Sequence, residues 1–136
     1  MSHMTDKVAS ITGAGRVIGR AAAEAFAANG ARVVLAARRE DELASPVLDI
    51  ETQGGKATAI RTDVSVASDV EKMVVHAVET FGRLDYAVNN AGWDRVLGID
   101  VKGTLLCMKY ESRAMLAGGR GGAIVNVGLT TSVLRI

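Results

Sequence analysis

The stretch from Thr12 to Arg20, TGAGRVIGR, constrains the fold more than any other part of this 136-residue chain. Residues 7–11 before it are largely apolar, as in a buried strand, and the residues after it have helical spacing up to Gly30. The buried face of that helix is expected at Ile18, Ala21, Ala22, Ala25 and Phe26. A glycine turn between a strand and a helix presents backbone N–H groups and a helix dipole to an anion. The stretch therefore predicts a phosphate-binding turn, with a plain tight connection as the alternative.

Composition bounds the class of protein. Hydrophobic residues make up 49% of the chain and charged residues 23%, which is typical of one globular domain. The net charge of +1 implies no general attraction to nucleic acid or to an anionic membrane, and no apolar run is long enough to span a bilayer. The single cysteine, Cys107, rules out an internal disulfide and indicates a reducing, cytoplasmic setting. Residues 1–4 are interpreted as a cloning remnant, and residues 5–136 as one incomplete domain.

Strands and helices are expected to alternate along the chain. Further strands are predicted at residues 32–36, 56–61, 84–88 and 123–127, and a long helix at residues 93–117. Because of Pro46, the second helix either begins near Ser45 or has an irregular first turn. Ser68 and Glu71 form a predicted capping box for the third helix. Its buried face is expected at Val70, Met73, Val74, Ala77, Val78 and Phe81. This alternation predicts an α/β fold, a Rossmann-type doubly wound parallel sheet of order 3-2-1-4-5.

Six motifs in this order resemble the short-chain dehydrogenase/reductase family. They are TGAGRVIG, VVLAARRE, TDVS, VNNAG, RVLGIDVKG and GAIVNV, and they run from about Lys7 to Val127. The resemblance implies a nicotinamide cofactor and hydride transfer to or from a carbonyl or alcohol carbon of a small molecule. It also implies a homodimer or homotetramer built on the long helix. No metal site is expected.

The resemblance also implies which residues bind the cofactor. Thr12, Gly13 and Gly19 match the family's glycine motif, but Val17 replaces its middle glycine and would crowd the diphosphate. The full set expected to bind the cofactor is Thr12, Gly13, Gly15, Arg16, Ile18, Gly19, Arg38, Arg39, Asp63, Val64, Asn89, Ala91 and Gly92. In the family the residue at Asp63 accepts a hydrogen bond from the adenine amino group; a turn aspartate before a helix is the alternative.

The end of the second strand bears on the choice of cofactor. NAD-specific members place an acid where this chain has Ala37, and Arg38 follows at once. Arg38 and Arg16 could flank a 2′-phosphate, so NADP(H) is favoured over NAD(H). The alternative is that Arg38 and Arg39 are solvated surface charges.

The catalytic serine, tyrosine and lysine of the family are missing from this sequence. Neither Tyr86 nor Tyr110 has a lysine four residues later. Asp100 stands where the family has an asparagine that supports a proton-relay water, and it is the catalytic candidate that remains. Segments that the family has between its motifs are missing after Gly92 and after Val127. The residues that follow Val127, GLTTS, are similar to a helical segment that comes after the catalytic lysine in the family.

Two explanations of these junctions stay open. Either ordered pieces of a longer protein have been joined, or the chain is shortened by deletion. The function predicted is an NADP(H)-dependent oxidoreductase. The alternatives are a non-catalytic NAD(P)-binding or sensor protein, or a truncated inactive fragment. A methyltransferase that binds S-adenosylmethionine is disfavoured by the arginines after the second strand and by the NNAG segment.

Overall fold

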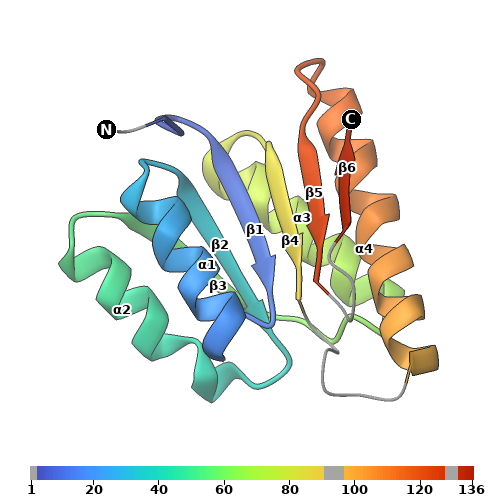
Figure 1. Cartoon of the computed structure of the whole chain (residues 1–136), viewed down its shortest axis with the longest axis horizontal. Helices are drawn as coiled ribbons and strands as arrows, with labels where there is room; N and C mark the ends of the chain where they lie inside the picture. The colour runs from blue at the N-terminus through green and yellow to red at the C-terminus, as the bar shows by residue number, and fades with distance from the viewer. Residues whose placement is uncertain (1–2, 91–96, 128–131) are drawn as a thin grey trace.

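The computed structural model describes residues 3–90, 97–127 and 132–136. Within these residues, one sheet has the strand order β3-β2-β1-β4-β5-β6 (Figure 1). The strands are β1 (Val8–Thr12), β2 (Arg32–Ala37), β3 (Lys56–Arg61), β4 (Tyr86–Asn89), β5 (Ala123–Asn126) and β6 (Ser132–Arg135). The first five are parallel, which confirms the predicted order 3-2-1-4-5.

The last strand was not expected from the sequence. Ser132, the final residue of GLTTS, begins β6, which pairs antiparallel with β5. The expectation of a helix at this serine is therefore wrong, because Ser132 pairs with Asn126 of β5 as part of a strand. Gly128 and residues 91–96 lie outside the described residues, so both junctions do as well.

Helices cover both faces of the sheet. They are α1 (Val17–Ala28), α2 (Ala44–Thr52), α3 (Ala67–Phe81) and α4 (Leu97–Ala117), and a 3-10 turn, η1 (Glu40–Glu42), precedes α2. Helices α1 and α2 pack on one face and α3 and α4 on the other (Figure 1). Successive strand residues alternate between the faces, so Val33 and Leu35 pack toward α1 and α2, while Val34 packs toward α3 and α4. No helix in the described ranges combines the length and the apolar content that crossing a bilayer requires.

The helix after the glycine turn buries a face that differs in part from the one expected, although Phe26 packs against the core as predicted. Gly19 and Ala23 are buried in α1, whereas Ile18, Ala21 and Ala25 are exposed. The expectation failed because it counted apolar side chains and gave no weight to a glycine. With no side chain at Gly19, the helix lies directly against the turn, and this contact decides which face meets the sheet.

The other two helix starts were predicted in part. α2 begins at Ala44 after η1, so Pro46 lies in its first turn and the opening is irregular. The capping box of α3 is wrong, because the N-cap residue is Val66 and Ser68 lies inside the helix. The buried face of α3 is confirmed at Val70, Met73, Val74 and Ala77, whereas Val78 is exposed.

Candidate functional site

A tight turn joins β1 to α1 at the carboxyl edge of the sheet, beside the point where the strand order reverses. Gly13 has a φ of 63°, a conformation that glycine adopts without strain. The N–H of Ala14 donates to the carbonyl of Ala36 at 3.1 Å and ties the turn to β2. A Cβ at Gly19 would lie 2.1 Å from the carbonyl oxygen of Gly13, so this position cannot carry a side chain. One glycine thus bends the backbone, and the other allows the helix to approach it.

The first turn of α1 begins at this edge. Its N-cap residue, Arg16, has an extended backbone, and no side chain in the described part of the chain caps the helix by a hydrogen bond. The first turn contains no acidic residue. The side chains of Val17 and Ile18 are 85% and 48% exposed, so Val17 projects from the turn rather than into the core. Helix-start N–H groups without a capping carboxylate favour an anion such as a diphosphate.

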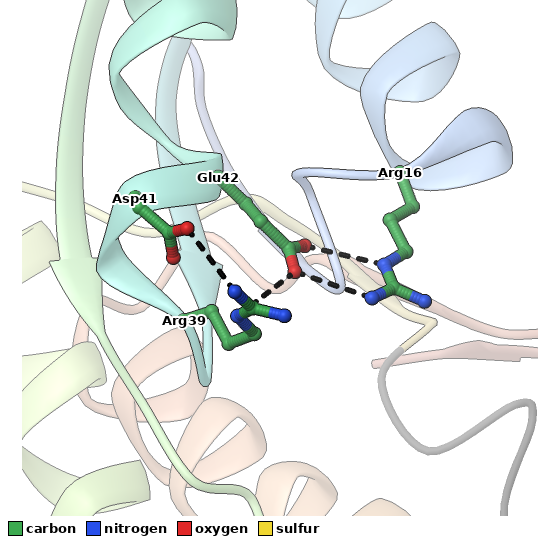
Figure 2. Close-up of polar contacts among 4 residues, drawn as sticks. All are labelled: Arg16, Arg39, Asp41 and Glu42. Carbon is green, nitrogen blue, oxygen red and sulfur yellow. Dashed lines mark hydrogen bonds and ion pairs between the residues drawn. The ribbon is translucent and has the colours of Figure 1, made fainter.

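A carboxylate joins two of the expected arginines (Figure 2). Arg16 binds Glu42 through two hydrogen bonds, from Nε to Oε2 and from Nη2 to Oε1, each of 3.3 Å. The Nε of Arg39 lies 3.7 Å from the same Oε1, and its Nη2 donates to Asp41 at 3.3 Å. The arginine of the glycine turn and an arginine that follows β2 therefore meet around one acidic side chain.

Arg38, the first residue after β2, is exposed, and its charge acts on Asp63. The Oδ1 of Asp63 accepts hydrogen bonds from the hydroxyl of Ser65 at 2.6 Å and from its N–H at 2.9 Å. These bonds lower the pKa of Asp63, and the positive charges of Arg38 and Arg61 lower it further. Asp63 is therefore a charged hydrogen-bond acceptor at neutral pH. Its neighbour Val64 lies against Gly103 of α4, where a Cβ would come within 2.8 Å of the valine Cγ2.

Two asparagines and a threonine hold together the carboxyl ends of β1, β4 and β5. The Oγ1 of Thr12 accepts the N–H of Asn90 at 2.9 Å. The side-chain amide of Asn90 donates to the carbonyl of Gly13 at 3.4 Å, and that of Asn89 donates to the Oδ1 of Asn126 at 3.0 Å. The buried side-chain oxygens of Asn89 and Asn90 have no partner among the described residues. The expected positions Ala91 and Gly92 lie outside these residues.

Glu111 of α4 is a buried acid that the sequence did not single out. It is fully buried, and its Oε1 accepts a hydrogen bond from the amide of Asn89 at 2.9 Å. Burial raises its pKa to about 8, against the opposing effect of Asn89 and Ser10, which favour the charged form. Burial also raises the pKa of the thiol of Cys107, one turn earlier, and the charge of Glu111 adds to this. Burial therefore favours the protonated form of Glu111, which lies behind the asparagine of the NNAG segment.

Neither tyrosine occupies the place of a catalytic acid. Tyr86 lies in β4 with its ring 5.7 Å from the ring of Phe26. Tyr110 lies in α4, flanked by the cationic groups of Lys109 and Arg113 at 5.3 and 5.8 Å from its ring centre. Asp100, the remaining catalytic candidate, belongs to α4. Only its backbone is part of the described structure. Among the described residues, neither tyrosine is therefore paired with a lysine four residues later.

Sequence reasoning also missed the role of Glu42. Acidic residues are common where a helix begins, so the run from Glu40 to Glu42 does not mark Glu42 as special. In the structure, a Cβ at Gly15 would lie 2.5 Å from the Cβ of Glu42. A glycine in the turn and an acid in η1 therefore pack against each other. The pair of unlike residues, 27 positions apart, leaves no periodic signal in the sequence.

Comparisons with known proteins agree with this arrangement. A family model described as short chain dehydrogenase matches residues 7–135. The A-factor type gamma-butyrolactone 1'-reductase (1S-forming) of Streptomyces virginiae is 40% identical over an alignment of 142 positions, which covers 93% of this chain and 55% of that protein. The 2,5-dichloro-2,5-cyclohexadiene-1,4-diol dehydrogenase of Sphingobium indicum is 35% identical over an alignment of 151 positions, which covers 100% of this chain and 59% of that protein.

These alignments also describe what this chain lacks. It spans a little over half the length of the curated relatives it matches. The alignment with the Sphingobium indicum protein is longer than this chain, 151 against 136 residues, so that relative carries internal residues that have no counterpart here. This agrees with the missing segments that the motif order indicates.

A solved structure gives the same result. A short chain dehydrogenase/reductase from Burkholderia phymatum, crystallised in complex with NAD, superposes with a TM-score of 0.84 at 33% identity, covering 93% of this chain and 50% of its own. The family model spans nearly the whole sequence, and the observed sheet carries the glycine turn at its point of reversal. The chain therefore belongs to the short chain dehydrogenase family.

Proposed function

We propose that this chain binds NADP(H) in preference to NAD(H), and that its reaction is hydride transfer between the nicotinamide and a carbonyl or alcohol of a small molecule. The observation that carries the proposal is that Arg16 of the glycine turn and Arg39 after β2 meet around Glu42 at the carboxyl edge. Arg38 lies directly before Arg39, at the end of β2. A 2′-phosphate attached to an adenosine ribose carries the charge that such a site favours.

The end of β2 supports the preference for NADP(H). Ala37 is buried at the strand end and offers no carboxylate to a ribose hydroxyl, whereas Arg38 and Arg39 are exposed. The relative from Burkholderia phymatum was solved with NAD, so a direct comparison of both cofactors is the deciding measurement.

The residues around the turn fit the rest of the cofactor. The N–H groups at the start of α1 would hold the diphosphate, and the ionised Asp63 would accept a hydrogen bond from the adenine amino group. The buried Oδ1 of Asn90 has no partner among the described residues, and the amide of the same side chain binds Gly13, so a donor on the cofactor at this turn would satisfy that oxygen. When bound, the nicotinamide supplies or accepts the hydride. This chain's residues bind and orient it.

A second function is favoured by one observation, the absence of a tyrosine–lysine pair in the sequence. A chain that binds the cofactor but lacks a proton donor would act as a binding or sensor protein, or be an inactive shortened form. Oxidation of NADPH in the presence of a panel of ketones, on material whose intact mass matches 136 residues, distinguishes the two. Turnover would exclude the sensor; binding without turnover would exclude the enzyme for this molecule.

The cofactor preference is tested by calorimetric titration of the chain and of Arg38→Ala with NADPH and NADH. We expect Arg38→Ala to weaken NADPH binding by about one to two orders of magnitude and to leave NADH binding nearly unchanged, because a charge-assisted hydrogen bond contributes about 1.5–3 kcal/mol. Arg120→Ala is the matched control, because it removes the same charge from an exposed position just before β5. Equal losses for both cofactors would contradict the preference, and no heat with either at millimolar concentration would contradict cofactor binding.

We also propose a homodimer or homotetramer in the cytoplasm. Support for assembly comes from α4, where the apolar side chains of Leu105 and Leu116 are 59% and 64% exposed. Light scattering after size exclusion tests this, with Leu105→Glu expected to shift the mass toward the monomer. A monomer in the parent chain would contradict it.

A further inference from the structure

We propose that Glu42 is a specificity-determining residue that restrains the 2′-phosphate site by holding Arg16 and Arg39. The inference rests on the proposed binding of NADP(H). It concerns a residue that lies beyond the strand-end position Ala37, where the choice between the two cofactors was expected to be set.

The backbone fixes where the Glu42 carboxylate lies. The N–H of Glu42 donates to the carbonyl of Arg39 at 3.1 Å, and the N–H of Leu43 donates to the carbonyl of Glu40 at 3.1 Å, which closes η1. Leu43 is 1% exposed and anchors the turn in the core. Gly15 removes the side chain that would otherwise meet Glu42 at 2.5 Å. The carboxylate is thus placed against the glycine turn by packing as well as by charge.

The contacts divide one negative charge between two guanidinium groups. Arg16 uses the side of its guanidinium, Nε and Nη2, on both oxygens of Glu42, and Arg39 approaches one of these oxygens (Figure 2). The side chains of Arg16 and Arg39 are 65% and 60% exposed, whereas that of Glu42 is 21% exposed. The anion is the fixed member of this cluster, and the arginines are the members that solvent, or a ligand, can reach.

An incoming 2′-phosphate would meet the same guanidinium donors. It must share them with Glu42 or displace it, and in either case it lies near a carboxylate of like charge. A ribose 2′-hydroxyl carries no charge and meets no such repulsion. Glu42 therefore lowers the affinity for a 2′-phosphate selectively, and its removal shifts the preference further toward NADP(H).

The test compares Glu42→Gln with the parent chain by calorimetry. The ligands are NADPH, NADH and adenosine 2′,5′-bisphosphate, which carries the 2′-phosphate without a nicotinamide. We expect Glu42→Gln to tighten NADPH and the bisphosphate about fivefold, as removal of a like charge at close range would, and to tighten NADH by a clearly smaller factor, because NADH carries the diphosphate but no 2′-phosphate. Glu40→Gln is the matched control, because it changes the same charge in the same turn at a residue with no ion pair among the described ones. It should leave all three affinities unchanged.

A second variant separates this contact from a general change of charge. In the Arg16→Ala background, Glu42→Gln should tighten NADPH by a smaller factor, because the main partner of the carboxylate is gone. Equal tightening by Glu40→Gln, equal tightening of NADH, or weaker NADPH binding in Glu42→Gln would each overturn the inference. NADPH binding that Glu42→Gln does not alter removes the inference alone, whereas no NADPH binding in any variant removes the proposed function and this inference with it.

Discussion

The two edges of the sheet hold their ion pairs in different ways. At the amino edge, Arg83 binds Asp85 through two hydrogen bonds of 2.7 Å, and Asp85 also accepts the N–H of Val8 at 2.9 Å. Asp85 is 5% exposed. At the carboxyl edge, the bonds between Arg16 and Glu42 are 3.3 Å long, and the side chain of Arg16 is 65% exposed.

This difference separates structural charges from charges that can bind. Burial alone raises the pKa of Asp85, but the bonds from Arg83 and from the N–H of Val8 hold it below its ordinary value. The carboxylate of Asp85 stabilises the fold, since its removal would leave the buried N–H of Val8 without an acceptor. The exposed pair at the other edge contributes little to stability, so its arginines can exchange one anion for another at small cost.

The largest expected effect is at the amino edge. Asp85→Asn should destabilise the protein by about 3 kcal/mol, because it leaves Arg83 and the N–H of Val8 without their carboxylate. Asp41→Asn, which removes an exposed partner of Arg39, should change stability by less than about 1 kcal/mol. Urea unfolding followed by circular dichroism measures both. Similar losses in the two variants would show that the edges do not differ in this way.

The second effect is on the turn at the carboxyl edge. In Gly19→Ala the added Cβ meets the carbonyl of Gly13, so α1 must move away from the turn. We expect a loss of about 1–3 kcal/mol in stability and NADPH binding too weak to detect. Gly54→Ser is a control at a glycine where an added Cβ has nothing within 4 Å, although its φ of 88° adds strain. It should lower stability but keep binding, and a Gly19→Ala protein that binds NADPH normally would contradict the assignment of this turn.

A third prediction concerns Glu111, the acid of α4 that is buried against the sheet. The pKa of Glu111 is about 8 in the folded protein, above its ordinary value of 4.5, so folding favours the protonated form. This contribution is complete below pH 4.5 and is lost as the pH rises to about 8. Over that window the parent chain should lose up to about 1.4 kcal/mol of stability per pH unit relative to Glu111→Gln.

Asp63 and Asp85 do not produce the same dependence of stability on pH. Asp85 and Asp63 have lowered pKa values, so their contributions change below their ordinary value of 3.8 and with the opposite sign. Unfolding free energies of the parent and Glu111→Gln at several pH values between 5 and 8 check the prediction. Parallel curves would show that Glu111 does not titrate as its burial indicates.

The sequence predicted the sheet well because strands repeat a simple pattern. Five short apolar runs, each bounded by turn residues, correspond to β1 to β5, with the order that alternating helices impose. The buried face of α1 was wrong in part and the cap of α3 was wrong, because they depend on a close approach at Gly19 and on the turn at Asp63, which local spacing does not show. The turn was predicted from its own pattern of strand, glycines and helix, and the arginines from the resemblance. Glu42 and Glu111 were not singled out, because Arg16 and Asn89, which bind them, lie 26 and 22 positions away in the chain.

The smallest expected effect concerns Val17, which replaces the family's middle glycine. Its side chain is 85% exposed at the start of α1, so it stands at the mouth of the turn without supporting the core. Val17→Gly should tighten NADPH and NADH equally, by about twofold to threefold, because the diphosphate is common to both, and should cost α1 less than about 1 kcal/mol. Val17→Ala separates the two effects, since it shortens the side chain without adding backbone freedom. Tightening by Val17→Ala as well would assign the effect to crowding by the valine, whereas weaker binding in both variants would mean that Val17 contacts the cofactor favourably.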